Sequence, residues 1–140
     1  RLARVGYDNV LGYLEGGIEE WLKQGKDYET TQRIAADQLE RMIAKDNPMI
    51  IDIRKKSEFD SEHVLGATNI PLNQINQHLS EFPKDKPFVI YCAGGYRSMI
   101  ASSILKQRGW DNFMDVDGGF SAIAQTGVKV SEYVCPTTML

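Results

Sequence analysis

The chain has 140 residues, of which 42% are hydrophobic and 25% charged, a composition that suits one compact globular domain with a short extension. The formal net charge is −3 at pH 7, so no basic surface indicates a nucleic-acid or anionic-membrane partner. No apolar run approaches the roughly 20 residues that a membrane-spanning helix needs, and the first residues lack the apolar stretch of a signal peptide.

The start of the chain repeats a pattern that occurs again near its end. A Gly-aromatic-Asp-Asn step followed by a Gly pair occurs twice, over residues 6–17 and 109–119. In both copies a further Gly lies eight positions after the second Gly of the pair. Self-similarity of this density indicates two related units. We therefore expect residues 1–28 to be the C-terminal remnant of a preceding, similar domain, and residues 29–33 to be a linker.

Helical and strand patterns then alternate through the main domain, which we place at residues 34–130. Leu39, Met42 and Ile43 have helical spacing, and the Asn-Pro step after them closes that helix. Short β-branched runs bounded by turn residues indicate buried strands. The elements expected as far as residue 82 are a helix over 36–45, a strand over 49–53, a short helix capped by Ser57, a brief strand over 67–69, and one amphipathic helix or two short ones over 72–82.

The most regular strand pattern, Phe-Val-Ile-Tyr, occupies residues 88–91 and ends at Cys92. A Gly pair follows, and a helix is expected over about residues 98–108, where a glycine stops it. Strands that alternate with helices in this way predict an α/β domain with a largely parallel sheet. Residues 131–140 are expected to form a C-terminal tail.

Cys92 and Cys135 are the two cysteines of the chain. A secreted disulfide scaffold of this size usually has more, so we expect a reducing, cytoplasmic location. The chain has neither a C-x-x-C pair nor an H-E-x-x-H motif, and we expect no metal and no other cofactor. A lone Cys is often only a small buried apolar residue. Its neighbours decide between that interpretation and a reactive thiol.

The neighbours of Cys92 favour a reactive thiol. The preceding strand delivers Cys92 to the carboxyl edge of the sheet, where open α/β folds bind ligands. Gly94 and Gly95 permit unusual dihedral angles and leave their N–H groups unshielded, and the following helix directs its N-terminus at the loop. Arg97 adds a permanent positive charge. Together these features stabilise a thiolate, which is the nucleophilic form of cysteine.

Residues 92–98 read Cys-Ala-Gly-Gly-Tyr-Arg-Ser, which resembles the active-site loop of the rhodanese family, C-x-x-G-x-R-[SA]. Residues 52–71 are similar to the family's upstream stretch D-x-R…E-[FY]…H-[IV]-x-G-A-x-[NH]-[IL]-P, and residues 117–130 resemble its Gly-Gly-aromatic segment. The three blocks occur in the family's order. The resemblance implies a rhodanese-like α/β fold with an open, mostly parallel five-stranded sheet and helices on both faces.

The resemblance also implies a sulfurtransferase in which Cys92 is the catalytic nucleophile. Its thiolate would attack the outer sulfur of thiosulfate or of a persulfide, hold that sulfur as a persulfide, and pass it to a thiol or cyanide acceptor. The six residues from Cys92 to Arg97 match sulfurtransferases, whereas the related cell-cycle phosphatases have one more. The expected substrate-binding residues are those that follow the nucleophile in the loop: Ala93, Gly94, Gly95, Tyr96, Arg97 and Ser98.

Charged residues upstream are expected to support the loop. Arg54 and Glu58 are four positions apart across a strand-to-helix turn, and we expect them to pair with each other. Asp52, at the end of a buried strand, has either a structural or a functional role. Arg97 either contacts an anionic donor, which we favour, or braces the loop. His63 is expected to make a structural hydrogen bond.

Two alternatives to a self-contained enzyme stay open. The domain could be a non-catalytic rhodanese module that binds a partner or delivers persulfide to a fused enzyme. Tandem copies of this type look like those fused behind metallo-β-lactamase-fold hydrolases, some of which oxidise persulfides, so a fused metallo-hydrolase or persulfide dioxygenase domain is an expected partner. Cys135 is either a resolving thiol or, as we prefer, a tail residue without that role. Ile123 departs from the family, which often has an aromatic residue there.

Overall fold

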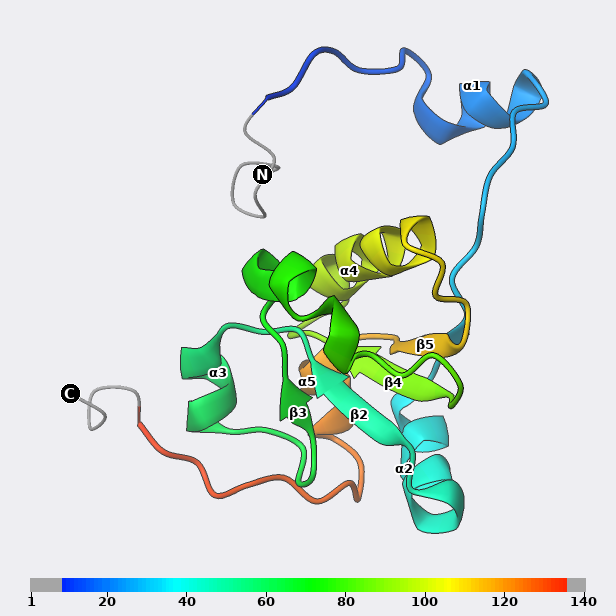
Figure 1. Ribbon diagram of the computed structural model, residues 1–140. Coiled ribbons are helices and arrows are strands. Elements are labelled where there is room, and N and C mark those ends of the chain that lie inside the picture. The colour runs from blue at the N-terminus through cyan, green and yellow to red at the C-terminus, as the bar shows by residue number, and fades with distance from the viewer. Residues whose placement is uncertain (1–8, 136–140) are drawn as a thin grey trace. The chain divides into compact units, whose positions relative to one another are not determined.

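The computed structural model describes residues 9–135, and the chain divides into two compact units, Arg1–Thr30 and Thr31–Leu140 (Figure 1). The described part of the first unit contains one helix, α1 (Gly17–Lys23). It begins at a Gly pair whose φ angles are 78° and 59°. The indole N–H of Trp21, within α1, donates at 2.8 Å to the carbonyl of Asp27, which lies beyond the end of the helix.

The second unit is built on one five-stranded sheet with the order β1-β5-β4-β2-β3. All four strand pairings are parallel, so the predicted α/β fold with a mostly parallel sheet is confirmed. The strands are β1 (Arg33–Ile34), β2 (Met49–Asp52), β3 (Thr68–Asn69), β4 (Phe88–Tyr91) and β5 (Phe113–Val116). β4 lies at the centre and is buried along its whole length, as its unbroken apolar sequence indicates.

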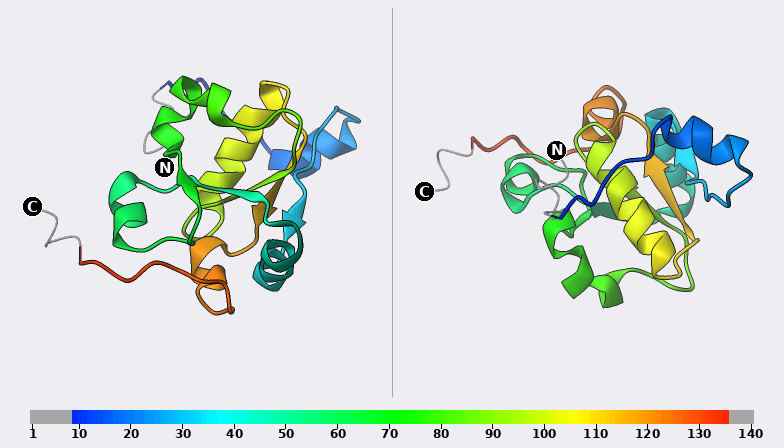
Figure 2. Two further views of the ribbon diagram at one scale, coloured as in Figure 1. Left: turned by 60° about the horizontal axis from the view of Figure 1, so that its bottom comes forward. Right: turned by 90° about the horizontal axis from the view of Figure 1, so that it is seen from above.

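Helices cover both faces of this sheet (Figures 1 and 2). On one face, Leu39 and Ile123 from two helices pack against Val89 and Tyr91 of β4 in the main apolar cluster. On the other face, the longest helix packs against β5 and one of two 3₁₀ helices. The helices of this unit are α2 (Ala36–Asp46), α3 (Lys56–Ser61), η2 (Leu72–Gln77), η3 (Leu79–Glu81), α4 (Tyr96–Gln107) and α5 (Gly119–Ile123).

The longer elements lie where they were predicted. The differences fall in the short elements and at the starts of helices. The region predicted as one helix or two is the pair η2 and η3. The predicted cap at Ser57 is wrong, because α3 begins after Lys55, whose backbone N–H donates to the Glu58 carboxylate at 3.2 Å. Helix α4 begins at Tyr96, two residues earlier than expected. Arg33, predicted to belong to a linker, is the first residue of β1.

The segment predicted as a C-terminal tail is hydrogen-bonded to the domain as far as the structure describes it. Val64 and Val130 form an antiparallel bridge. Beyond it, the backbone N–H of Ser131 donates to the His63 carbonyl at 2.8 Å, and that of Val134 donates to the Ser61 carbonyl, also at 2.8 Å. This segment therefore lies along the connection from α3 to β3. Within residues 9–135, no helix is long and apolar enough to cross a bilayer.

Candidate active site

Cys92 follows β4 directly, at the carboxyl edge of the sheet, and its side chain is buried. The loop after it curls back over the sulfur, so that the backbone N–H of Gly95 donates to Sγ at 3.1 Å. Gly95 has a φ of 99°, a left-handed conformation that favours glycine. The loop thus directs a peptide dipole at the sulfur atom, which favours its anionic form.

Helix α4 starts at the residue after Gly95, so its N-terminus adjoins the Cys92 loop. The hydroxyl of Ser98, in the first turn, is fully buried and donates to the Gly95 carbonyl at 3.1 Å. This bond joins the loop to the helix. The positive end of the helix dipole then faces the region of the sulfur, where it stabilises negative charge.

A second glycine pair packs directly against the backbone of the loop. The N–H of Phe120 donates to the Cys92 carbonyl at 2.7 Å, and that of Ser121 donates to the Ala93 carbonyl at 3.0 Å. A Cβ on Gly119 would lie 2.9 Å from the Ala93 carbonyl oxygen and closer still to that of Cys92. Only glycine allows this approach. The Gly-Gly-aromatic block of the sequence therefore clamps the loop through main-chain hydrogen bonds.

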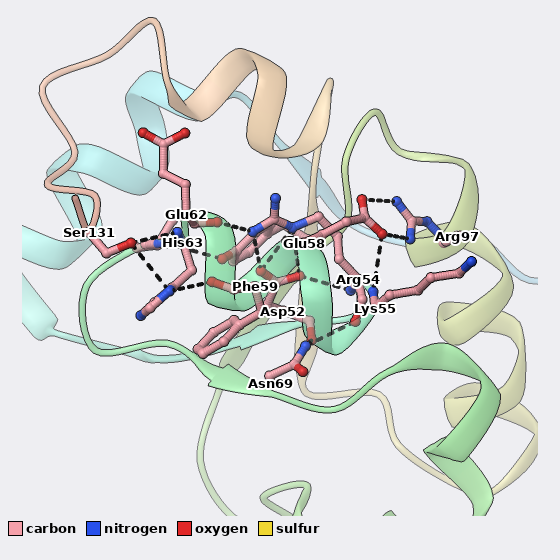
Figure 3. Close-up of polar contacts among 12 residues, drawn as sticks. Asp52, Arg54, Lys55, Glu58, Phe59, Glu62, His63, Asn69, Arg97 and Ser131 are labelled. Carbon is pink, nitrogen blue, oxygen red and sulfur yellow. Dashed lines mark hydrogen bonds and ion pairs between the residues drawn. The ribbon is translucent and has the colours of Figure 1, made fainter. Parts of the chain in front are cut away.

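Arg97 braces the loop instead of pointing freely at a ligand. Its guanidinium donates to both oxygens of Glu58, at 2.6 and 2.8 Å (Figure 3). This fork-to-fork pair joins the first turn of α4 to α3 across 39 residues of sequence. The hydrogen bonds from Arg97 hold the pKa of Glu58 below its usual value, although partial burial opposes this shift. The geometry thus favours the bracing role over the donor contact that the sequence analysis preferred.

The predicted pairing of Arg54 with Glu58 is wrong. Figure 3 shows Arg54 turned back over Asp52, to whose carboxylate its Nε and Nη2 atoms donate at 2.7 to 3.1 Å. Nη2 also donates to the Glu62 carbonyl at 2.7 Å, and the guanidinium lies 4.2 Å from the centre of the Phe120 ring. Because Asp52 is buried and occupied by these bonds, the geometry favours its structural role.

The other predicted residues lie around this frame. Within the loop, Ala93 is half-buried, while Gly94 and Tyr96 are exposed at its rim. His63 stacks on the Phe59 ring, with 3.8 Å between ring centres, and its Nδ1 lies 2.7 Å from the Phe59 carbonyl. That is a structural hydrogen bond of the expected kind. Cys135 is exposed at the end of the described tail.

Three charged residues beside the loop were missed by the sequence analysis. Asp115 in β5 is fully buried, and burial raises its pKa. Arg33 in β1 lies with Nε 3.5 Å from the Asp115 carboxylate and donates from Nη2 to Asp117 at 2.6 Å. The available signal was a carboxylate inside the otherwise apolar run Phe-Met-Asp-Val. A buried acid in such a run needs a cationic or polar partner.

A cavity of about 300 Å³ lies beside α3. It shares Glu58 with the Arg97 pair and Phe120 with the glycine clamp, and its lining residues are Arg54, Ser57, Glu58, Ser61, Glu62, Phe120 and Tyr133. Across residues 9–135, no group of three or more His, Cys, Asp and Glu side chains could hold a metal ion.

The Cys92 loop and most of the sheet lie within the match to a known protein family. A family model, the rhodanese-like domain, matches residues 35–126. Among curated proteins, the chain is 32% identical over 91 residues to a sulfurtransferase of Allochromatium vinosum, covering 65% of this chain and 85% of that protein. It is 31% identical over 91 residues to the thiosulfate sulfurtransferase GlpE of Shewanella oneidensis, covering 65% and 90%. The protein YqhL of Bacillus subtilis is 41% identical over 71 residues, 51% of this chain, and the match spans 56% of YqhL.

Solved structures agree with the family model. A rhodanese-related protein of Thermoplasma volcanium superposes with a TM-score of 0.65 at 28% identity, over 71% of this chain and 97% of that one. A rhodanese-like domain protein of Staphylococcus aureus gives a TM-score of 0.65 at 29% identity, over 73% of this chain and all of that one.

Proposed function

Because the chain belongs to the rhodanese-like family, we propose that it is a sulfurtransferase in which Cys92 carries a sulfane sulfur as a persulfide. The observation that carries the proposal is the hydrogen bond from the Gly95 N–H to Sγ at 3.1 Å. A backbone donor directed at the sulfur supports a loop that stabilises negative charge there. The relatives named as sulfurtransferases support the reaction class.

With thiosulfate as donor, the Cys92 thiolate attacks the outer sulfur. A new S–S bond forms to Sγ, the S–S bond of thiosulfate breaks, and sulfite leaves with the bonding electron pair. The product is an anionic persulfide on Cys92. An acceptor thiolate or cyanide then attacks the outer sulfur of this persulfide, which releases a thiolate on Cys92 and forms a new persulfide or thiocyanate. Each displacement conserves charge and needs no cofactor.

The frame around the loop suits both displacements. The starting thiolate and the persulfide are anions, so the Gly95 N–H and the N-terminus of α4 stabilise both. The Arg97–Glu58 pair and the Gly119 clamp hold the loop from two sides. The loop therefore changes little between the two states, which lowers the cost of reorganisation.

Intact mass spectrometry tests this proposal directly. We expect the parent protein to gain about 32 Da, one sulfur atom, after thiosulfate or persulfide treatment. Cys92→Ser should gain nothing, and Cys135→Ser should gain as much as the parent. Thiocyanate should form when cyanide is added to the parent and to Cys135→Ser.

Two results would contradict the proposal. The absence of any sulfur gain with a range of donors would favour a non-catalytic module that binds a partner or delivers persulfide to a fused hydrolase. A gain that survives in Cys92→Ser and is lost in Cys135→Ser would move the site to the exposed cysteine. That a metallo-hydrolase is fused to this domain stays a prediction.

A further inference from the structure

The C-terminal segment forms one wall of the cavity beside α3. Two hydrogen bonds hold it there: the Val134 N–H donates to the Ser61 carbonyl at 2.8 Å, and the Ser61 hydroxyl donates to the Val134 carbonyl, also at 2.8 Å. Tyr133, one residue earlier, lines the cavity. It lies outside residues 35–126, which the family model matches. The wall therefore lies beyond the family match, and it is in place without a ligand.

Arg54 offers an unused hydrogen-bond donor to this cavity. Its side chain is only 6% exposed, and its Nε and Nη2 atoms donate to Asp52 and to the Glu62 carbonyl. The third nitrogen, Nη1, has no hydrogen-bond partner within residues 9–135, and Figure 3 shows it pointing away from Asp52. Nη1 is not sealed inside the protein, and Arg54 lines the cavity. This donor is therefore available to a ligand.

Two further polar groups line the cavity, the Ser57 hydroxyl and the Glu62 carboxylate. In the described chain, neither group has a hydrogen bond or an ion pair of its own. Ser57 and Arg54 together provide two donors, which suits the two oxygens of a carboxylate. The Glu62 carboxylate accepts hydrogen bonds only, which suits an ammonium group.

The charges around the cavity decide which ligands fit. The charges of Arg54 and Glu58 are each balanced by an ion pair, so Glu62 leaves the cavity with a net negative charge. A simple anion is repelled by Glu62, and a simple amine leaves the Arg54 donor unused. A molecule that has both an ammonium and a carboxylate group meets both requirements. The rings of Phe120 and Tyr133 add apolar contacts, which suit an aliphatic or thioether side chain.

We propose that the cavity between α3 and the C-terminal segment binds a small zwitterion of the α-amino-acid class. The carboxylate binds Arg54 and Ser57, the ammonium binds Glu62, and the side chain packs between the two rings. The volume of about 300 Å³ is at the lower end of the roughly 300–1,000 Å³ found for small-molecule pockets. The inference goes beyond the proposed function and does not rest on it, because binding involves no chemistry at Cys92.

The test is binding of L-methionine to the full chain, measured by titration calorimetry and by amide chemical shifts. We expect shifts at Phe120 and Val134, whose amides lie at the cavity. The amine that lacks the carboxylate of methionine, and the acid that lacks its ammonium, should each bind at least roughly tenfold more weakly, because each leaves one charged contact unmade. Cys92→Ser should bind methionine like the parent, so a failure of sulfur transfer would leave this result unchanged.

Two variants separate charge from packing. Glu62→Gln should weaken methionine binding by at least about fivefold, but it should not weaken binding of the acid, because it removes a repulsion. Tyr133→Ala should weaken both by about threefold or more, since it removes an apolar wall. Glu81→Gln is the matched control, because Glu81 is exposed in η3 and does not line the cavity. It should leave binding unchanged.

Three results would overturn the proposal. One is the absence of methionine binding, or amide shifts that leave out Phe120 and Val134. Another is an amine or an acid that binds as tightly as methionine, because the site would then not select a zwitterion. The third is parent-like methionine binding in Glu62→Gln. Thermal unfolding of each variant shows whether it is folded.

Discussion

The two glycine pairs of this chain have nearly the same backbone. Gly16 and Gly17 have φ angles of 78° and 59°, and Gly118 and Gly119 have angles of 72° and 55°. In each pair the second glycine is the first residue of a short helix. A Cβ on the first glycine would meet the side chain four positions later, at 2.9 Å in one region and 2.8 Å in the other. The local turn therefore depends on the local sequence alone.

What differs is the surface that each pair meets. A Cβ on Gly119 would overlap the backbone of the Cys92 loop, whereas a Cβ on Gly17 would contact nothing within 4 Å in the described chain. The same motif is a clamp in one region and a bare turn in the other. The clamp therefore depends on the loop that the glycine pair meets, which is a separate segment of the sequence.

The shared geometry supports, as a proposal, the idea that the first unit is the end of a second rhodanese-like repeat. Five large apolar side chains around its turn are at least 45% exposed, which is more apolar surface than one short helix can bury: Val10, Leu11, Leu14, Ile18 and Leu22. Residues 6–8, which carry most of the repeated Gly-aromatic-Asp-Asn step, lie outside the described residues.

The largest effect is expected from Gly119→Ala, which breaks the clamp. The added methyl group would overlap the Cys92 and Ala93 carbonyls and sits on a backbone with φ of 55°. We expect a loss of about 2 to 4 kcal/mol in the free energy of unfolding. Sulfur transfer should fall at least roughly tenfold, because the loop moves. Urea unfolding and thiocyanate formation measure the two effects. Parent-like values for both would show that the loop does not depend on the clamp.

The next largest effect is expected at the Arg97–Glu58 pair, which also holds the loop. Glu58→Gln removes the charged partner of Arg97, and we expect roughly tenfold slower sulfur transfer with a smaller change in stability. The pKa of Glu58 is lowered in the folded state. The folded protein therefore binds fewer protons than the unfolded chain, and the contribution of Glu58 is present above the unfolded-state pKa of about 4.3 and is lost as the pH falls through the lower folded value.

Urea unfolding at pH 7 and pH 3 checks this sign. The stability difference between the parent and Glu58→Gln should shrink at pH 3. A difference that grows on acidification would mean that Glu58 is not held as the anion by Arg97. Lys56, which pairs with Asp60 on the exposed side of α3, provides the control variant Lys56→Gln, with little effect on transfer.

A smaller effect is expected from exchanging the residue after each glycine pair. Phe120 lies under the Arg54 guanidinium at 4.2 Å, and Ile18 takes its place in the first region. Phe120→Ile removes the cation–π contact and part of the buried ring, so we expect a loss of roughly 1 to 2 kcal/mol in unfolding free energy. The reciprocal Ile18→Phe should change it by less than about 0.5 kcal/mol. Equal effects in the two regions would contradict the comparison.

The elements predicted correctly are those whose pattern is local. The apolar run of β4 and the helical spacing of Leu39, Met42 and Ile43 each lie within one window of sequence, and so does the Cys92 loop. Strand β1 was missed because it has only two residues, whereas β5, which is as long as β4, was missed because a charge interrupts its apolar run. A two-residue strand has no period that a sequence can display.

The pairing of charges around the site could not be predicted for a different reason. Proximity in sequence favoured Arg54 with Glu58, but the turn after β2 folds Arg54 back over Asp52. Glu58 is then free to meet Arg97, which lies 39 residues away in sequence and is brought near only by the tertiary fold. Arg33 is farther still in sequence from its partner Asp117, which lies 84 residues along the chain. Ion pairs between elements follow from the topology, and the topology has to be known first.

The smallest effect is expected from Gly17→Ala, the counterpart of Gly119→Ala. Its φ of 59° makes alanine strained, but no described atom lies where the methyl group would go. The cost should be the conformational strain alone, about 1 kcal/mol, and it should fall on the first unit. Thermal unfolding of the second unit and sulfur transfer should therefore match the parent. A loss of transfer comparable to that of Gly119→Ala would mean that the first turn also supports the Cys92 loop, and the two regions would no longer differ in function.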